Sequence, residues 1–450
     1  MFHCGDQHTS IMYRLVILIF SIFVCIQCPS CALEKGLSSS KRYQLKQVQI
    51  VHRHGDRTPI TPMKDEEFWS NSLPEPFLLK KISEDTNIIQ LQGESENSHA
   101  AKGRGVFGKL TKLGLLQMVE VGTRIREQLH TVENYNVNGV DDPEQVRLFH
   151  AEQPLHPKKI KVYSTNFPRT LQSVQAVLVG MFPEGLPCPV DIDATNTNIL
   201  IPDPQPRATS EQVEVERRLA MRPHMIQREK ELKDLAIRVS NILRNGYLGE
   251  DADQISFGVG EDNDVNSNAE TPPLAWSQLS EITTCLRSRG KLPDEITHKD
   301  HETITSHSAW RWFENLRDPQ LSKMAMRAIV AKMLQTLKSG VTDDDEESCN
   351  EILYLYSAHD SSLIGLLCAF RLDQPAKWPE YGSYFKIELI QEEDILEGPN
   401  KNAKYYVRFS LNGDTLKCNW GVGHPNYKTS TDLIPLDVLT DSIHADHSIE

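Results

Sequence analysis

The stretch Gln47-Val-Gln-Ile-Val-His-Arg-His-Gly-Asp-Arg-Thr-Pro59 decides the fold of this chain. Its first residues alternate between apolar and polar side chains, which predicts a β-strand. A glycine and a proline follow, and both favour a turn. Arg53, His54 and Arg57 therefore lie at the end of a strand, a common place for ligand sites in α/β sheets.

The chemistry of this strand end indicates a site for an anion. A guanidinium group offers a planar fork of donors that fits phosphate oxygens, and it is always charged. The positive charges of Arg53 and Arg57 would lower the pKa of His54 and keep one ring nitrogen available for attack on phosphorus. A basic turn that closes an edge strand is the structural alternative, and further strand ends are needed to decide between the two.

A second strand end adds another arginine. Residues Lys159–Thr165 predict a short strand, and Leu171–Met181 predict a helix with one apolar side. Arg169 lies between them, at the start of the helix, where the backbone favours anions. An ordinary surface arginine at a helix cap is the alternative, but the neighbouring motif favours a third phosphate ligand.

A third strand end adds a histidine and a carboxylate. Residues Glu351–Tyr356 are nearly all apolar, as in a buried central strand, and Ser361–Phe370 predict a helix. His359 and Asp360 lie between these two elements. Asp360 alone would be explained as a helix N-cap, but that explanation does not account for His359.

Four motifs in one order resemble the acid phosphatase branch of the histidine phosphatase superfamily. They are Arg-His-Gly-x-Arg-x-Pro at 53–59, Gly-x-Leu-Thr-x-x-Gly at 108–114, Ser-Thr-x-x-x-Arg-Thr at 164–170 and Tyr-Ser-Ala-His-Asp at 356–360. The resemblance covers about Gln47 to Leu411. One departure is Asn166-Phe-Pro before Arg169, where relatives often have acidic residues, so the polarity of the pocket is an open point.

The resemblance implies an α/β fold with a mixed central sheet, flanking helices and an inserted, smaller, mainly helical domain. We expect a signal peptide at residues 1–32 and one histidine acid phosphatase domain at 41–440. Within it, the α/β core is predicted at about 41–75, 155–205 and 345–440, and the helical cap at about 76–154 and 206–340. Thr111 is expected to cap a helix at about Leu115–Leu129. Residues 61–108 are expected to be loop-rich and 183–208 to be a loop, and one long helix is expected at about Ser210–Asn245.

The resemblance also implies a mechanism. His54 would attack phosphorus and form a phosphohistidine, and Asp360 would protonate the leaving alcohol. The remaining site residues, which would hold the phosphate oxygens, are Arg53, Arg57, Arg169 and His359. A carboxylic acid must be protonated to donate, so we expect an acidic optimum. No metal or cofactor is required, because arginines supply the positive charge.

The substrate is expected to be a small phosphomonoester, and its identity is open. A phytase-like or inositol polyphosphate phosphatase is one alternative, because Lys80, Lys81, Lys102 and Arg104 in the 61–108 insertion suit a highly charged substrate. A lysophosphatidate phosphatase is a second alternative. A non-catalytic phospho-ligand binder is a third, although intact His54 and Asp360 argue against it. A homodimer is compatible with the sequence.

The composition and the N-terminal sequence indicate where in the cell the protein is expected. The chain has 450 residues and a net charge of −14, which excludes bulk attraction to nucleic acid or anionic lipid. Arg14 precedes the apolar run Leu15–Ile26, and small residues up to Ala32 offer a cleavage point. A retained single-pass anchor is the alternative. We therefore expect the secretory pathway, with a secreted or lysosome- or vacuole-like protein and no stable membrane span after cleavage.

Cysteines and histidines elsewhere predict little chemistry. After the leader, the cysteines are Cys188, Cys285, Cys349, Cys368 and Cys418. One or two disulfides plus a free thiol would suit a secreted enzyme, with Cys368 the buried free thiol. The pair His298 and His301 suggests a metal only superficially, because no third ligand has a sensible spacing, so a helix start is the better interpretation.

Overall fold

The computed structural model describes residues 41–90, 105–130, 155–195, 198–202, 209–250, 252, 272–341, 352–394, 403–420 and 432–447. The predicted leader at 1–32 and Cys349 lie outside these residues, as do Lys102 and Arg104. Within the described ranges, no helix is long and apolar enough to cross a bilayer.

A mixed sheet forms the centre of the described chain, as predicted. Its strand order is β2-β4-β3-β5-β1-β6-β7-β8, with β9 paired to β7. The first five strands in this order are parallel, and the pairs from β1/β6 onward are antiparallel. The strands are β1 (Lys41–Arg53), β2 (Thr86–Ile89), β3 (Ile160–Ser164), β4 (Val190–Asp193), β5 (Leu353–Ala358), β6 (Tyr384–Asp394), β7 (Lys404–Leu411), β8 (Asp414–Leu416) and β9 (Ile434–Pro435).

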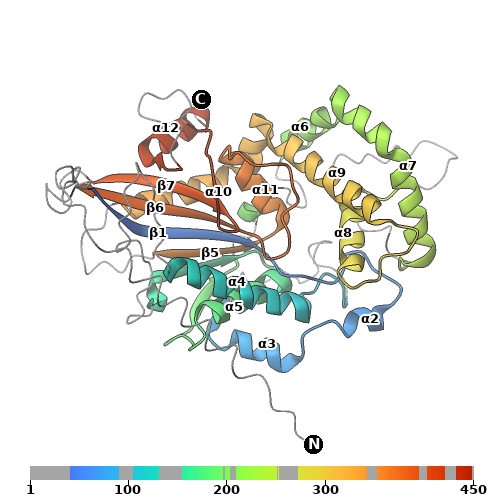
Figure 1. The fold of residues 1–450 in the computed structure, drawn as a ribbon, viewed down its shortest axis with the longest axis horizontal. Helices are drawn as coiled ribbons and strands as arrows, with labels where there is room; N and C mark the ends of the chain where they lie inside the picture. The colour runs from blue at the N-terminus through green and yellow to red at the C-terminus, as the bar shows by residue number, and fades with distance from the viewer. Residues whose placement is uncertain are drawn as a thin grey trace, which may run out of the picture. The chain divides into compact units, whose positions relative to one another are not determined.

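Helices surround the sheet and extend beyond the carboxyl ends of its parallel strands (Figure 1). They are α2 (Glu66–Ser70), α3 (Pro76–Ser83), α4 (Lys112–His130), α5 (Pro168–Met181), α6 (Ser210–Ala220), α7 (Pro223–Gly246), α8 (Trp276–Arg287), α9 (His298–Leu316), α10 (Pro319–Ser339), α11 (Asp360–Ala369) and α12 (Leu436–His447). Two short 3-10 helices are η2 (Pro157–Lys159) and η3 (Asn198–Leu200).

The central strand β5 is buried along its whole length because helices cover both faces of the sheet. Leu353 and Leu355 face the layer formed by α4 and α5. Tyr354 and Tyr356 face the layer that contains α10, α11 and α12. Since side chains alternate along a strand, an apolar run such as that of β5 is what a sheet covered on both faces requires.

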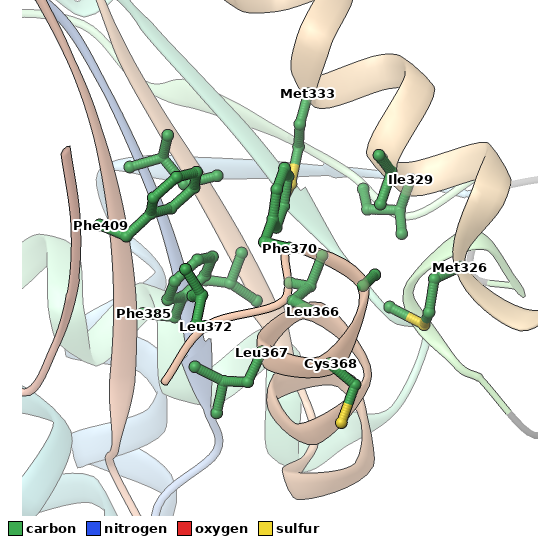
Figure 2. Packing of buried hydrophobic residues seen from close by; sticks show 14 of the residues in the cluster. Met326, Ile329, Met333, Leu366, Leu367, Cys368, Phe370, Leu372, Phe385 and Phe409 are labelled. Atoms are coloured by element: carbon green, nitrogen blue, oxygen red, sulfur yellow. The ribbon is translucent and has the colours of Figure 1, made fainter. Parts of the chain in front are cut away.

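Aromatic side chains join the helical layer that contains α10, α11 and α12 to the antiparallel half of the sheet (Figure 2). Phe370, just after α11, lies 5.1 Å from the ring of Phe409 on β7 and 6.2 Å from that of Phe385 on β6. Met326 and Met333 of α10 belong to the same buried cluster. This packing fixes α11, whose first turn contributes to the site described below.

A separate helical cluster forms the cap. It contains Val239 of α7, Leu279 of α8 and Ile304 of α9, all fully buried, and Trp69 of α2 packs with them. This cap is smaller than predicted. Helices α4 and α10, which the sequence boundaries placed in it, instead pack on the sheet, because each carries an apolar face that completes one of the two layers.

Several local predictions need correction. The predicted loop at 183–208 contains β4, a short strand hidden between prolines and polar residues. The loop-rich 61–108 region contains α2, α3 and β2, and Pro76 begins α3 at a position where its missing N–H costs nothing. The long helix predicted at about 210–245 is two helices, because Pro223 cannot continue the first and instead starts the second.

Two other local predictions are confirmed. Thr111 accepts a hydrogen bond from the backbone N–H of Gly114, 3.1 Å away, and so caps α4. The stretch around His298 is a helix start, where Thr297 and Asp300 form a capping box. His301 is buried in α9 and its Nδ1 lies 3.1 Å from the hydroxyl of Thr283.

The predicted disulfides are absent among the described cysteines. Cys188 is exposed, and Cys285, Cys368 and Cys418 are buried, all with free thiols. Cys285 belongs to the cap cluster and Cys368 to the sheet layer, so their burial in different cores keeps them apart. Burial of Cys368 as a free thiol agrees with the prediction.

Candidate active site

Three parallel strands end at the same edge of the sheet. Arg53 at the end of β1 pairs in register with Ala358 at the end of β5, and Ser164 at the end of β3 pairs with Ser357. Helices α5 and α11 begin just beyond these ends. The strand register therefore brings together the three segments that carry the predicted site residues.

His54 lies at the centre of this edge and is almost completely buried. Its Nδ1 lies 2.8 Å from the carbonyl oxygen of Gly55, which can only accept, so Nδ1 carries the proton and Nε2 keeps its lone pair. Burial, followed by the charges of Arg169 and Arg53, lowers the pKa of His54 well below its ordinary value. The ring is thus neutral and chemically able to act as a nucleophile.

Arg53 is held by three groups. Its Nη1 donates to the carbonyl oxygen of Pro379 at 2.6 Å, and its Nη2 lies 2.7 Å from a carboxylate oxygen of Asp360. The guanidinium carbon is 4.0 Å from the ring centre of Tyr381, a cation–π contact. Its Nε is buried without a hydrogen-bond partner among the described residues.

Arg57 is paired with a carboxylate from the cap. Its Nη1 lies 2.7 Å from Oε1 of Glu281 on α8. Both side chains are buried, with 6% of each exposed to solvent. The same Nη1 donates to the carbonyl oxygen of Thr58 at 3.0 Å. The Nε of Arg57, like that of Arg53, has no partner among the described groups, so a donor remains for a ligand.

Arg169 enters the site from the first turn of α5. Its Nη1 donates to the carbonyl oxygen of Gly108 at 3.4 Å, and its guanidinium lies 4.6 Å from the ring centre of Phe167. Burial and then the charge of Arg57 lower the pKa of Arg169, whereas Asp360 opposes the shift. Two guanidiniums that repel each other in this way favour binding of an anion between them.

His359 and Asp360 begin α11. The ring of His359 is 5.6 Å from that of His54, and its Nε2 lies 3.0 Å from the hydroxyl of Thr165. Burial alone would raise the pKa of Asp360, but the charges of Arg53 and His359 outweigh it and the pKa is lowered. In the free protein, Asp360 is therefore ionised and paired with Arg53.

Two glycines allow the motif to approach α4. A Cβ at Gly55 would lie 2.3 Å from the carbonyl oxygen of Gly114, and a Cβ at Gly114 would lie 2.0 Å from that of Asp56. No real side chain tolerates such distances. The two glycines therefore set how closely the turn after β1 packs on the start of α4.

Other residues of the site were not predicted. Glu281, Cys285 and Tyr381 come from α8 and from the segment before β6. The hydroxyl of Tyr381 lies 3.6 Å from the Cys285 thiol, and the Tyr381 ring is 5.7 Å from that of His54. One signal was available: Glu281 is the sole charged residue between Leu274 and Leu286.

Comparison with known proteins gives the family. Residues 44–412 match the family model described as the histidine phosphatase superfamily (branch 2). The chain belongs to this superfamily. The predicted family, the mixed α/β fold and the enzyme class, a phosphoric monoester hydrolase, are thus confirmed.

The proteins to which this chain is similar are distant from it in sequence. Lysophosphatidic acid phosphatase type 6 of Bos taurus is 25% identical, over 79% of this chain and 76% of the relative. Counting factor 60 of Dictyostelium discoideum is 23% identical over 83% and 81%, and lysosomal acid phosphatase of Rattus norvegicus is 23% identical over 85% and 74%. The phytase of Citrobacter braakii, 16% identical, covers 90% of this chain and 98% of its own, with a TM-score of 0.54, which shows the shared fold.

Proposed function

We propose that this phosphatase is an acid phosphatase that hydrolyses phosphomonoesters through a phosphohistidine. The neutral, buried His54, with its Nδ1 proton directed at Gly55, is the observation that carries the proposal. His54 and Asp360 are the proposed catalytic residues. The proposed phosphate ligands are Arg53, Arg57, Arg169 and His359.

In the first step, Nε2 of His54 attacks phosphorus and the bond from phosphorus to the ester oxygen breaks. Asp360 transfers its proton to that oxygen, and the alcohol leaves. The arginines offset the charge that spreads over the equatorial phosphate oxygens. In the second step, Asp360 accepts a proton from water, the water oxygen attacks phosphorus, and the bond to His54 breaks to release inorganic phosphate.

Asp360 changes its protonation state when the substrate binds. In the free protein its carboxylate pairs with Arg53, and its pKa is lowered despite burial. A bound phosphate takes over part of the charge of Arg53 and adds its own negative charge, and both effects raise the pKa of Asp360. Since the donor form must be present, turnover should fall as the pH rises above the acid range.

Lysophosphatidate is the first substrate to test, because type 6 lysophosphatidic acid phosphatases align over most of this chain. The pairing of Arg53 and Arg57 with carboxylates favours a substrate with a single phosphate over a polyphosphate such as phytate. Lys80 and Lys81, considered for a polyphosphate, lie exposed on α3.

We further propose that the protein is located in a secretory or lysosome-like lumen, in line with the lysosomal relatives.

A substrate panel tests the proposal. Purified protein is assayed at pH 4 to 7 with lysophosphatidate, simple alkyl and aryl phosphates, and phytate. We expect hydrolysis of the monophosphates with highest kcat at the acid end, and a much lower kcat/KM for phytate. Turnover that is confined to phytate, or that rises toward pH 7, would contradict the proposal.

A further inference from the structure

A carboxylate of the cap is fixed inside the phosphate site. Oε1 of Glu281 accepts from Nη1 of Arg57 at 2.7 Å and from the backbone N–H of Ile60 at 2.5 Å. Its Oε2 accepts from the hydroxyl of Thr61 at 3.3 Å. Three donors from one turn thus hold a buried, charged group that the proposed mechanism does not use.

The same face of α8 contacts the turn at two further points. Glu281, Cys285 and Arg289 are spaced by four residues, so they lie along one side of the helix and its continuation. The Cys285 thiol donates to the carbonyl oxygen of Arg57 at 3.5 Å, and Arg289 pairs with Asp56 at 2.5 Å. This face of α8 therefore matches the charges of the turn, with an acid opposite Arg57 and a base opposite Asp56.

Glu281 differs from Asp360, the other carboxylate paired with an arginine of the site. The Asp360 side chain is 21% exposed, and its pairing with Arg53 must change when a substrate binds. The Glu281 side chain is 6% exposed and is held by the backbone as well as by Arg57. Asp360 is an exchangeable partner, whereas Glu281 is a permanent one.

We propose that Glu281 is a positioning residue that orients Arg57 toward the phosphate and, as a fixed counter-charge, limits the affinity of the site for released phosphate. This inference rests on the proposed function. Buried arginines with little compensation would retain a phosphate dianion, and one permanent carboxylate weakens that attraction. Burial and the charge of Arg57 lower the pKa of Arg169, and Glu281 opposes this shift. Glu281 therefore already offsets part of the positive charge that would attract phosphate.

Glu281→Gln separates the charge from the geometry. The amide keeps an oxygen that can accept from Arg57 and Ile60, but it removes the negative charge. We expect the inhibition constant for inorganic phosphate to fall by about three- to tenfold, with KM for an alkyl phosphate falling alongside it. The unliganded protein should melt at a lower temperature, while added phosphate should raise its Tm more than it raises that of the wild type.

Glu302→Gln is the matched control, since Glu302 is an exposed glutamate on α9 of the same cap. It should change neither the phosphate inhibition constant nor the Tm shift. A purely structural role for Glu281 predicts weaker or unchanged phosphate binding in Glu281→Gln, and that outcome would overturn the inference.

Glu281→Asp tests the orienting role, and it also serves if the glutamine variant does not fold. The shorter side chain keeps the charge but withdraws the carboxylate from Arg57, so we expect KM to rise several-fold while kcat changes less. An unchanged KM would contradict the orienting role. If the wild type hydrolyses no phosphomonoester, the proposed function fails; if it is active but both Glu281 variants match it, the inference alone fails.

Discussion

The edge of the sheet and the cap contribute to the site in different ways. The edge supplies His54 from the turn after β1, and Arg169 and Asp360 from the first turns of the helices that follow β3 and β5, so each residue is placed by its own neighbours in sequence. The cap supplies Glu281 from a helix more than two hundred residues from the motif it contacts. This difference underlies our proposal that the edge carries the reacting groups, while the cap adjusts their charge and orientation.

The largest expected effect is at the edge. His54→Ala removes the nucleophile, so kcat/KM for any phosphomonoester should fall by about 10⁴-fold or more. Steady-state assays with an aryl phosphate measure this loss. His444→Ala, at an exposed position on α12, is the control and should retain full activity. If His54→Ala kept activity within tenfold of the wild type, His54 would not be the nucleophile.

The second effect concerns the proton donor. Asp360→Asn should lower kcat for alkyl phosphates by about 10²–10⁴-fold, since an alkoxide leaves poorly without a proton. An aryl phosphate with an acidic leaving group should lose much less in the first step. The ratio of the two losses, measured in single-turnover assays, is the readout. If the rates for alkyl and aryl phosphates fell by the same factor, the proton donor would be a residue other than Asp360.

A third prediction concerns the packing of the motif against α4. Gly55→Ala places a methyl group 2.3 Å from the carbonyl oxygen of Gly114, so the backbone must shift. We expect a loss of about 3 kcal/mol in the free energy of unfolding, typical of overpacking. Gly246→Ala, where no atom of the described residues lies within 4 Å of the new Cβ, is the matched control and should be nearly neutral. Denaturant unfolding compares the two, and equal stability of the variants would refute the close approach.

The smallest effect is on stability against pH. Burial lowers the pKa of His52 on β1 to about 4, so this ring is neutral in the folded protein down to that pH. Below the ordinary histidine pKa of about 6.5, the unfolded chain binds a proton that the folded one does not, so stability is lost as the pH falls. Between pH 6.5 and 5, His52 alone should lower the free energy of unfolding by about 1.6 kcal/mol.

Urea unfolding at several pH values measures this slope, and His52→Gln should flatten it. The exposed His444→Gln should leave the slope as it is in the wild type. A slope unchanged by His52→Gln would show that this ring is charged within the sheet.

The edge was predictable from sequence because its signals are local. A strand pattern followed by Arg53 and His54, or by His359 and Asp360, specifies both the element and the place of the side chains on it. The parallel register then brings the segments together, which α/β topology implies. The strand β4 and the break at Pro223 were missed because short or interrupted elements carry weak periodic signals.

The cap contacts were not predictable because they depend on packing between distant segments. Nothing near Glu281 shows that its partner is Arg57, and nothing near Tyr381 shows that its ring covers Arg53. Likewise, the amphipathic patterns of α4 and α10 did not show which surface they cover. The one usable signal was that Glu281 is the sole charged residue between Leu274 and Leu286.

The most direct test of the account is to trap the phosphoenzyme in Asp360→Asn. An aryl phosphate should still phosphorylate this variant, whereas hydrolysis of the intermediate, which needs a base, should be slow. After rapid quenching in alkali and mass spectrometry, we predict close to one phosphate per chain, attached to His54. A variant that carries no phosphate at any time after mixing, or carries it on another residue, would contradict the account.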